Sequence, residues 1–186
     1  SFAEVYFLLM SGAGVGVDVS KRYIEKIPKV KKLNGERQKV VFEDSKEGWA
    51  VGTMEVCRAM WEGYDVEWDL SKLRPQGARL KTFGGRSSGP GPLDETLHFI
   101  KHMVEAHRDR KLSSTNAFDI ITKIANSVVV GGVRRSSIIT LSDLYDSGMR
   151  NAKQGQFWIT NGHRAMSNNS AIYDIKPNSI DFMKEW

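Results

Sequence analysis

The sequence has very little cysteine and no long hydrophobic run. Its single cysteine, Cys57, excludes an intramolecular disulfide, a zinc site made of cysteine pairs and a redox dithiol built from these 186 residues alone. No apolar run approaches the roughly 20 residues that cross a bilayer. The segment from Ser1 to Gly12 also lacks the basic flank and small-residue cleavage site of a signal peptide. We therefore expect a soluble, cytoplasmic protein with no membrane partner.

The composition is that of a folded protein with a modest excess of positive charge. Hydrophobic residues make up 40% and charged residues 26% of the chain, which is typical of one globular domain or a large piece of one. The 27 lysines and arginines outnumber the 22 aspartates and glutamates, for a net charge of +5. This excess favours anionic partners, and nucleotides, nucleic acid and phosphates all remain open.

Basic residues are concentrated in two stretches. Residues 71–93 contain five basic and no acidic residues, together with five glycines and three of the five prolines, which predicts a loop. Residues 21–39 contain eight basic and two acidic residues around Pro28 and Asn34-Gly35, which predicts an exposed connection with a turn. A solvated basic surface is the alternative to a binding role for both stretches.

The spacing of hydrophobic residues predicts alternating helices and strands. Helices are expected from Phe2 to Gly12, from Asp44-Ser45 to about Trp61, from near Asp94 to about Val104, and from about Thr115 to Ala125. In the second of these helices, Asp44 and Glu47 are placed like a capping pair. Strands are expected at residues 15–19 and 137–141. Helices and strands that alternate through glycine turns favour an α/β architecture.

The first candidate binding motif is the glycine-rich turn Ser11–Gly16. Its glycines let a ligand approach backbone N–H groups closely. A helix precedes the turn and a strand follows it, whereas a dinucleotide-binding fingerprint needs the opposite order, and glycines two residues apart do not match G-x-G-x-x-G. A plain tight turn is the alternative.

Two further loops combine glycine with basic side chains. In the 71–93 loop, guanidinium and ammonium groups surround Gly84-Gly85 ahead of a helix N-terminus, an arrangement that suits a triphosphate. The segment Gly131–Ser137 places two arginines between Gly-Gly and Ser-Ser, and such arginines can stack on a base or hydrogen-bond to it. A flexible basic loop and a solvated turn are the respective alternatives.

Other polar groups give weaker signals. His98 and His102 lie one helical turn apart, but Lys101 lies between them and an exposed polar face explains them better, so no metal site is predicted. Cys57 falls on the apolar side of its helix and is expected to be a core residue. The polar run Asn168–Ser170 invites ligand contact, which spacing alone does not establish.

Five segments, taken in their order, resemble the adenosylcobalamin-dependent (class II) ribonucleoside-triphosphate reductases. They are FLLMSGAGVG (7–16), DSKEGW (44–49), RPQGARLKTFGGRSSGP (74–90), VGGVRRS (130–136) and NNSA (168–171). The run that begins at Arg74 is long and specific, whereas the 11–16 turn means little alone. The resemblance covers essentially the whole chain. It implies that residues 1–186 are a single segment of the reductase barrel domain, incomplete at both ends.

The resemblance implies a fold and an activity. The fold is part of a ten-stranded α/β barrel, and the activity is the conversion of ribonucleoside triphosphates to 2′-deoxyribonucleoside triphosphates by thiyl-radical chemistry, a step of deoxyribonucleotide biosynthesis for DNA replication. The complete enzyme would use adenosylcobalamin, a deoxynucleoside triphosphate effector and a thioredoxin-like reductant. The family's catalytic cysteines have no match in this sequence, and Cys57 receives no catalytic role. Because an incomplete barrel leaves a strand edge and an apolar face unpaired, we expect the chain by itself to aggregate.

The resemblance also assigns roles to the loops. The turn formed by Ala13, Gly14, Val15 and Gly16 would lie beside the substrate. Phosphates of the effector would be held by Arg74, Arg79, Lys81 and Arg86. The segment between effector and substrate would be Gly131, Gly132, Val133, Arg134, Arg135 and Ser136, in which Arg134 senses the base and also contacts the substrate. Substrate choice would then be allosteric, because the effector would change the arrangement of this loop.

Two alternatives remain open. A non-catalytic nucleotide- or RNA-binding module would use the same basic, glycine-rich loops. Single-strand binders place exposed aromatic residues among the basic ones, and only Phe83 lies within the 71–93 loop, so no nucleic-acid partner is expected. Class I reductases have comparable Gly-Ala-Gly and Gly-Gly-Val-Arg loops, while the GGRSSGP run is closer to the cobalamin-dependent type.

Overall fold

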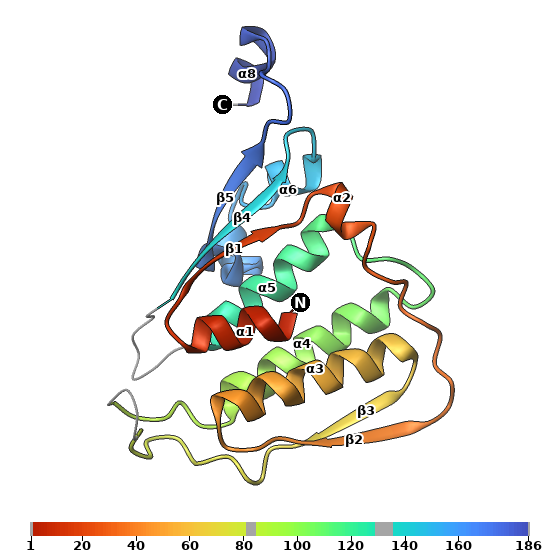
Figure 1. Cartoon of the computed structure of the whole chain (residues 1–186), viewed down its shortest axis with the longest axis vertical. Coiled ribbons are helices and arrows are strands. Elements are labelled where there is room, and N and C mark those ends of the chain that lie inside the picture. Colours follow the sequence, from red (N-terminus) through yellow and green to blue (C-terminus); the bar gives the residue numbers. More distant parts are fainter. Residues whose placement is uncertain (1, 81–84, 129–135, 186) are drawn as a thin grey trace.

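The computed structural model describes residues 2–80, 85–128 and 136–185, within which helices and strands alternate (Figure 1). The strands are β1 (Gly14–Asp18), β2 (Arg37–Val41), β3 (Asp65–Asp69), β4 (Ser137–Asp143) and β5 (Ser167–Ile172). The longer helices are α1 (Phe2–Met10), α3 (Lys46–Glu62), α4 (Gly91–Ala106) and α5 (Ser114–Ser127). The shorter ones are α2 (Lys21–Ile24), α6 (Ser147–Asn151), α7 (Phe157–Thr160), α8 (Ser179–Glu185) and the 3-10 helix η1 (Gly162–Met166). The expected α/β class is confirmed.

The strands form two separate parallel sheets. One sheet has the order β1-β4-β5, and the other pairs β2 with β3. In the first sheet, Gly14 lies opposite Ser137, and Ile138 lies opposite Ser167. Because the three strands are parallel, their amino ends lie along one edge of the sheet. The described residues that lead into the strands at that edge are the Ser11–Ala13 turn, Ser136 and the helix η1.

Four helices lie between the two sheets (Figure 1). Helix α1 contacts β1 and α3, helix α5 contacts α1, α4 and β4, and helix α3 contacts both β2 and β3. The largest fully buried side chains include Tyr6, Phe42 and Phe118, which belong to one hydrophobic core. Burying a side chain of this size contributes about 1.5–3 kcal/mol. No helix within the described ranges is both long and apolar enough to span a bilayer.

The N-cap of helix α3 is one residue later than the predicted one. It is Ser45, whose hydroxyl accepts a hydrogen bond from the N–H of Gly48 at 2.9 Å. Asp44, predicted as the cap, instead accepts hydrogen bonds from a distant arginine side chain described below. A Cβ at position 48 would lie 2.4 Å from the carbonyl oxygen of Glu43, so the turn into the helix requires glycine there.

Several predicted boundaries were wrong. Residues 21–39, expected to be a connection, contain α2 and the first residues of β2. Helix α4 begins at Gly91 with Pro92 in its first turn, so the basic loop ends earlier than residue 93. Strands β3 and β5 were not predicted. Acidic residues disfavour strands in isolation, but the acidic residues of β3 are paired with basic residues of β2, for example Lys39 Nζ with Asp69 Oδ2 at 2.9 Å.

Candidate nucleotide-binding site

The amino edge of the three-stranded sheet gathers three of the predicted motifs. The turn at residues 11–13 enters β1, Ser136 precedes β4, and Ser167 begins β5. Residues 131–135, including Arg134, lie outside the described residues. Ser136 is buried, and its hydroxyl has no hydrogen-bond partner in the described part of the chain. The parallel topology therefore brings together motifs that are more than a hundred residues apart in sequence.

One face of this sheet is open. Residues of β4 that face the helices, such as Ile138 and Thr140, are buried, whereas Ser137 and Ile139 on the opposite face are exposed. The same alternation places Gly14 and Gly16 of β1 on the open face. No described helix covers these residues, and Figure 1 shows α1 and α5 on the other side.

The glycines of β1 are not explained by the packing of this chain. Neither Gly14 nor Gly16 has a positive φ, so their backbone conformation is open to any residue. A Cβ at Gly16 would lie 3.7 Å from Ile139 Cγ2, which is an ordinary contact, and a Cβ at Gly14 would lie 3.2 Å from Ser137 Oγ. Glycine inside a strand weakens it by about 0.5–1 kcal/mol relative to alanine and often marks a close approach by a ligand or another backbone. The open face thus has room for a molecule that side chains would exclude.

The base of the basic loop is fixed by acidic partners next to α3. Arg74 Nε lies 2.8 Å and 3.0 Å from the two carboxylate oxygens of Asp44, and Lys72 pairs with Glu43. The Arg74 and Asp44 side chains are each about one third exposed. Arg74, predicted to bind an effector phosphate, is therefore engaged in holding the loop onto the start of α3.

Two segments of the basic loop, residues 77–80 and 85–87, pair in antiparallel fashion as the arms of a short hairpin. The Gly77 N–H donates to the Ser87 carbonyl at 2.9 Å and the Ser87 N–H donates to the Ala78 carbonyl at 2.8 Å. An antiparallel bridge places Arg79 directly opposite Arg86. Like charges in directly opposite positions are destabilising, and among the residues that the structure describes neither arginine has an acidic partner. An anion between the two guanidinium groups would relieve this repulsion. Lys81 lies outside the described residues.

A buried charged cluster that sequence analysis missed anchors the approach to β5. Asp119 of α5 accepts hydrogen bonds from Arg164 Nε at 2.6 Å and Nη2 at 2.8 Å, and its Oδ1 lies 3.2 Å from His163 Nε2. The three side chains are 8%, 15% and 10% exposed, respectively. Burial by itself raises the pKa of the Asp119 carboxyl. The hydrogen bonds and positive charge of Arg164 and His163 lower the pKa by more than burial raises it, so the pKa lies below its ordinary value. In the sequence, an aspartate at a position flanked by apolar residues of α5 was the signal that could have indicated a buried ion pair.

The two weaker candidates, His98 and Cys57, make packing contacts within the described chain. His98 packs edge-on against Trp68, with ring centroids 4.8 Å apart, and lies 3.7 Å from the Asp94 carboxylate. No group of three or more potential metal ligands occurs within the described ranges. Burial raises the pKa of the Cys57 thiol to about 12, so the thiol is protonated at neutral pH. It packs against the core as predicted.

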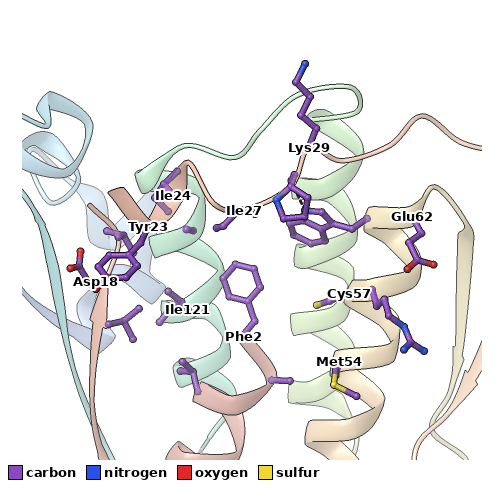
Figure 2. Close-up of a pocket in the computed structure, with 18 of the residues that line it drawn as sticks. Phe2, Asp18, Tyr23, Ile24, Ile27, Lys29, Met54, Cys57, Glu62 and Ile121 are labelled. Carbon is purple, nitrogen blue, oxygen red and sulfur yellow. Dashed lines mark hydrogen bonds between the residues drawn. The ribbon is translucent and has the colours of Figure 1, made fainter. Parts of the chain in front are cut away.

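A separate groove of about 690 Å³ lies on the helix side of β1. Figure 2 shows Phe2, Ile24, Ile27 and Ile121 around it, with Cys57 on α3 at its side, while the Lys29 amine points away. The lining is mainly apolar and offers few polar groups to orient a nucleotide. The groove and the glycine-bearing face therefore lie on opposite sides of β1.

Comparisons with known proteins find similarity to one kind of enzyme. Residues 29–104 match a family model described as the insertion domain of B12-dependent ribonucleotide reductase. Adenosylcobalamin-dependent ribonucleoside-triphosphate reductases match at 29% identity in Lactobacillus gasseri (91% of this chain), 34% in Euglena gracilis (74%) and 30% in Lacticaseibacillus paracasei (90%). A crystal structure of B-12 dependent (class II) ribonucleotide reductase superposes with a TM-score of 0.80 and 26% identity over 93% of this chain.

The similarity is to a part of each of these proteins. The chain covers 28% of the Lactobacillus gasseri and Lacticaseibacillus paracasei proteins, 19% of the Euglena gracilis protein and 28% of the crystallised chain. Both sequence and fold thus confirm the resemblance that the five segments predicted. The chain corresponds to a segment that spans about a quarter of such a reductase.

Proposed function

We propose that this chain, which matches a segment of the class II ribonucleotide reductases in sequence and fold, carries the substrate-side surface and the allosteric specificity loops of a ribonucleoside-triphosphate reductase. The complete protein would reduce ribonucleoside triphosphates to 2′-deoxyribonucleoside triphosphates in the cytoplasm, by thiyl-radical chemistry. Residues 1–186 would act as one segment of its barrel domain. A thioredoxin-like protein would return electrons to it.

The observation that carries the proposal is the pair of unexplained glycines at the amino edge of the sheet. Gly14 and Gly16 belong to one of the segments that resemble the reductases, and they leave open the face beside the start of β4. We propose that the nucleotide substrate lies over Ala13–Gly16. In this arrangement, residues 131–136 would reach the substrate from the neighbouring strand, with Arg134 as the side chain that senses its base.

The effector would bind the hairpin of the basic loop. Arg79 and Arg86 face each other without acidic partners in the described part of the chain, which favours phosphates between them. Lys81 would add a further charge, while Arg74 and Asp44 would keep the hairpin in place beside α3. Binding of the effector would then act on substrate choice through residues 131–136.

The chemistry itself is assigned to parts of the protein beyond these loops. Adenosylcobalamin would supply the radical in the complete enzyme. The apolar groove offers few hydrogen-bond partners for the amide-rich rim of a corrin ring, so the described residues do not fit this cofactor and none is assigned to it. Cys57 lines that groove with its thiol protonated, and we assign it no catalytic role.

The first experiment asks whether the open face is the substrate surface. In the full-length protein supplied with adenosylcobalamin and a dithiol, we expect reduction of ribonucleoside triphosphates. Gly16→Ala should weaken substrate binding about ten- to hundredfold, because forcing a methyl group into a close contact costs about 1–3 kcal/mol. The melting temperature should not fall, since the added Cβ meets only Ile139 at 3.7 Å.

Gly91→Ala is the matched control, because a Cβ at that exposed helix start meets no atom within 4 Å. It should leave both binding and activity unchanged. Absence of reductase activity in the unmutated protein would contradict the proposed function. Activity with normal substrate binding in Gly16→Ala would leave the function standing and remove the Ala13–Gly16 surface from the substrate site.

A further inference from the structure

We propose that Asn168, which lies on the open face of the sheet two strands away from Gly16, binds the nucleoside part of the substrate. The inference rests on the proposed function and deepens it, because it adds a polar side chain to a surface that so far consists of glycine backbone. It concerns a residue of β5, two strands away from the glycine-rich turn.

The strand register places Asn168 in line with the glycines. Gly16 pairs with Ile139, and Ile139 pairs with Asn168. Neighbouring strands lie about 4.8 Å apart, so Asn168 is about 10 Å from Gly16 across the sheet. This span is within the reach of a nucleoside that covers Gly16 and Ile139.

The contacts of its neighbours confirm which way Asn168 faces. Ser167 Oγ lies 2.8 Å from Thr140 Oγ1 on the buried, helix-facing side of the sheet. Successive side chains alternate between faces, so Asn168 lies on the open face with Gly16 and Ile139, whereas Asn169 shares the helix-facing side with Ser167. Asn168 is exposed, and its carboxamide makes no hydrogen bond to any residue in the described ranges.

The start of β5 is held firmly enough to position a side chain. Arg164, three residues before Ser167, joins α5 through Asp119 and also donates from Nη1 to the Ala152 carbonyl at 2.7 Å. The His163 ring packs against Phe99 with centroids 5.1 Å apart, and Lys153 Nζ donates to the Ser167 carbonyl. These contacts fix the backbone on both sides of the strand's first residue, so the carboxamide keeps its place before a ligand arrives.

The residues of this sheet favour a nucleoside over a phosphate. None of the residues in β1, β4 and β5 is basic, so the strands offer no cation to a phosphate. The charge of Asp18 in β1 is already compensated by Arg22, whose Nη2 lies 3.1 Å from its carboxylate. The neutral carboxamide of Asn168 both donates and accepts hydrogen bonds, which suits ribose hydroxyls or the edge of a base. The phosphates would therefore lie toward the amino edge, where the Ser11–Gly14 backbone enters the strand.

The test compares two neighbouring asparagines in the full-length protein. Asn168→Ala should weaken equilibrium binding of the ribonucleoside triphosphate about three- to tenfold, the effect of one lost hydrogen bond, while Asn169→Ala should change it less than about twofold. Binding of inorganic tripolyphosphate should be the same in both variants and in the unmutated protein. Effector affinity should also be unchanged, since no hydrogen bond between described residues joins the hairpin to Asn168.

Three outcomes distinguish the possibilities. Equal nucleotide affinities for the Asn168→Ala and Asn169→Ala variants would overturn the inference. A parallel loss of tripolyphosphate affinity in Asn168→Ala would also overturn it, because the residue would then act on the phosphates. An unmutated protein that reduces no ribonucleotide would contradict the proposed function itself, independently of how the two variants compare.

Discussion

Asp119 shows how a single residue can connect the helix layer to the sheet. Its carboxylate is almost completely buried, yet it stays ionised because Arg164 places two N–H groups on its two oxygens and His163 lies beside it. Buried charges are tolerated when they are paired and hydrogen-bonded. Through Arg164, the cluster sets the point at which β5 begins, and so affects the position of Asn168.

We expect Asp119→Asn to destabilise the full-length protein at neutral pH and less so in acid. Removing one partner of a buried ion pair costs about 3–5 kcal/mol, since the remaining charge is left without compensation. The folded-state pKa of Asp119 lies below its ordinary value, so the stabilisation is present above that ordinary value and is lost as the pH falls through the folded-state pKa. Thermal unfolding at several pH values would measure it.

Asp109→Asn provides the control for this comparison. Asp109 is largely exposed, lies 3.7 Å from Lys32, and has a positive φ of 62°, a conformation that asparagine also adopts readily. This substitution should leave the unfolding temperature unchanged at every pH. A difference between Asp119→Asn and the unmutated protein that stays constant down to strongly acidic pH would contradict the ionised pair.

At the scale of elements, the basic loop divides into a fixed base and an exposed hairpin. Lys72 and Arg74 at the base are paired with the acidic residues just before α3, which neutralises two of the five positive charges that made the loop conspicuous in the sequence. Arg79 and Arg86 at the hairpin face each other and remain exposed. The two halves therefore differ in structure: the base is fixed by ion pairs, whereas Arg79 and Arg86 have no acidic partner in the described ranges.

We expect Arg79→Ala to lower the affinity for a deoxynucleoside triphosphate effector about ten- to hundredfold, because a hydrogen bond to a charged group is worth about 1.5–3 kcal/mol. The affinity should also become less sensitive to salt. In the absence of effector, the variant should be at least as stable as the original, since one of two opposed like charges is gone. Equilibrium binding at two ionic strengths would check both effects.

Arg110→Ala is a suitable control for the hairpin, because Arg110 is exposed on a different loop. It changes the net charge by the same amount without touching the hairpin. Equal losses of affinity in Arg79→Ala and Arg110→Ala would show that general charge, and not the position opposite Arg86, attracts the effector.

At the scale of the whole molecule, the described chain has surfaces that a folded protein normally covers. The outer edges of β1 and β5 have no strand partner in the described ranges. The groove beside Phe2 and Cys57 is largely apolar, and the open face of the sheet carries Ile139 at 40% exposure. Unpaired strand edges and apolar grooves are templates for association with another chain.

The 186-residue chain prepared by itself should therefore self-associate. Light scattering coupled to size-exclusion chromatography should show a mass that grows with concentration, because both the strand edges and the groove can pair between copies. A monomer at all concentrations would contradict this expectation. It would mean that the helix layer alone keeps the edges apart.

The sequence by itself determined the four longer helices, two of the strands and the family resemblance. Apolar spacing predicted α1, α3, α4 and α5, and β-branched runs predicted β1 and β4, because these patterns reflect local backbone preferences and one buried side. The glycine turns and basic runs indicated nucleotides, and their order indicated the reductase family, which the comparisons confirmed. The roles of individual loop residues remain proposals.

Tertiary structure decided which of these residues meet. The sequence did not reveal β3 or β5, since the acidic residues of β3 and the asparagines of β5 disfavour strands until a neighbouring strand supplies partners. Nor did it show that Arg74 binds Asp44, or that Asp119 binds Arg164 across 45 positions. Such pairings depend on distances in space, which local preferences do not encode. The parallel register alone brought Gly16 and Asn168 onto one face, and the surface proposed here for the substrate exists only because of it.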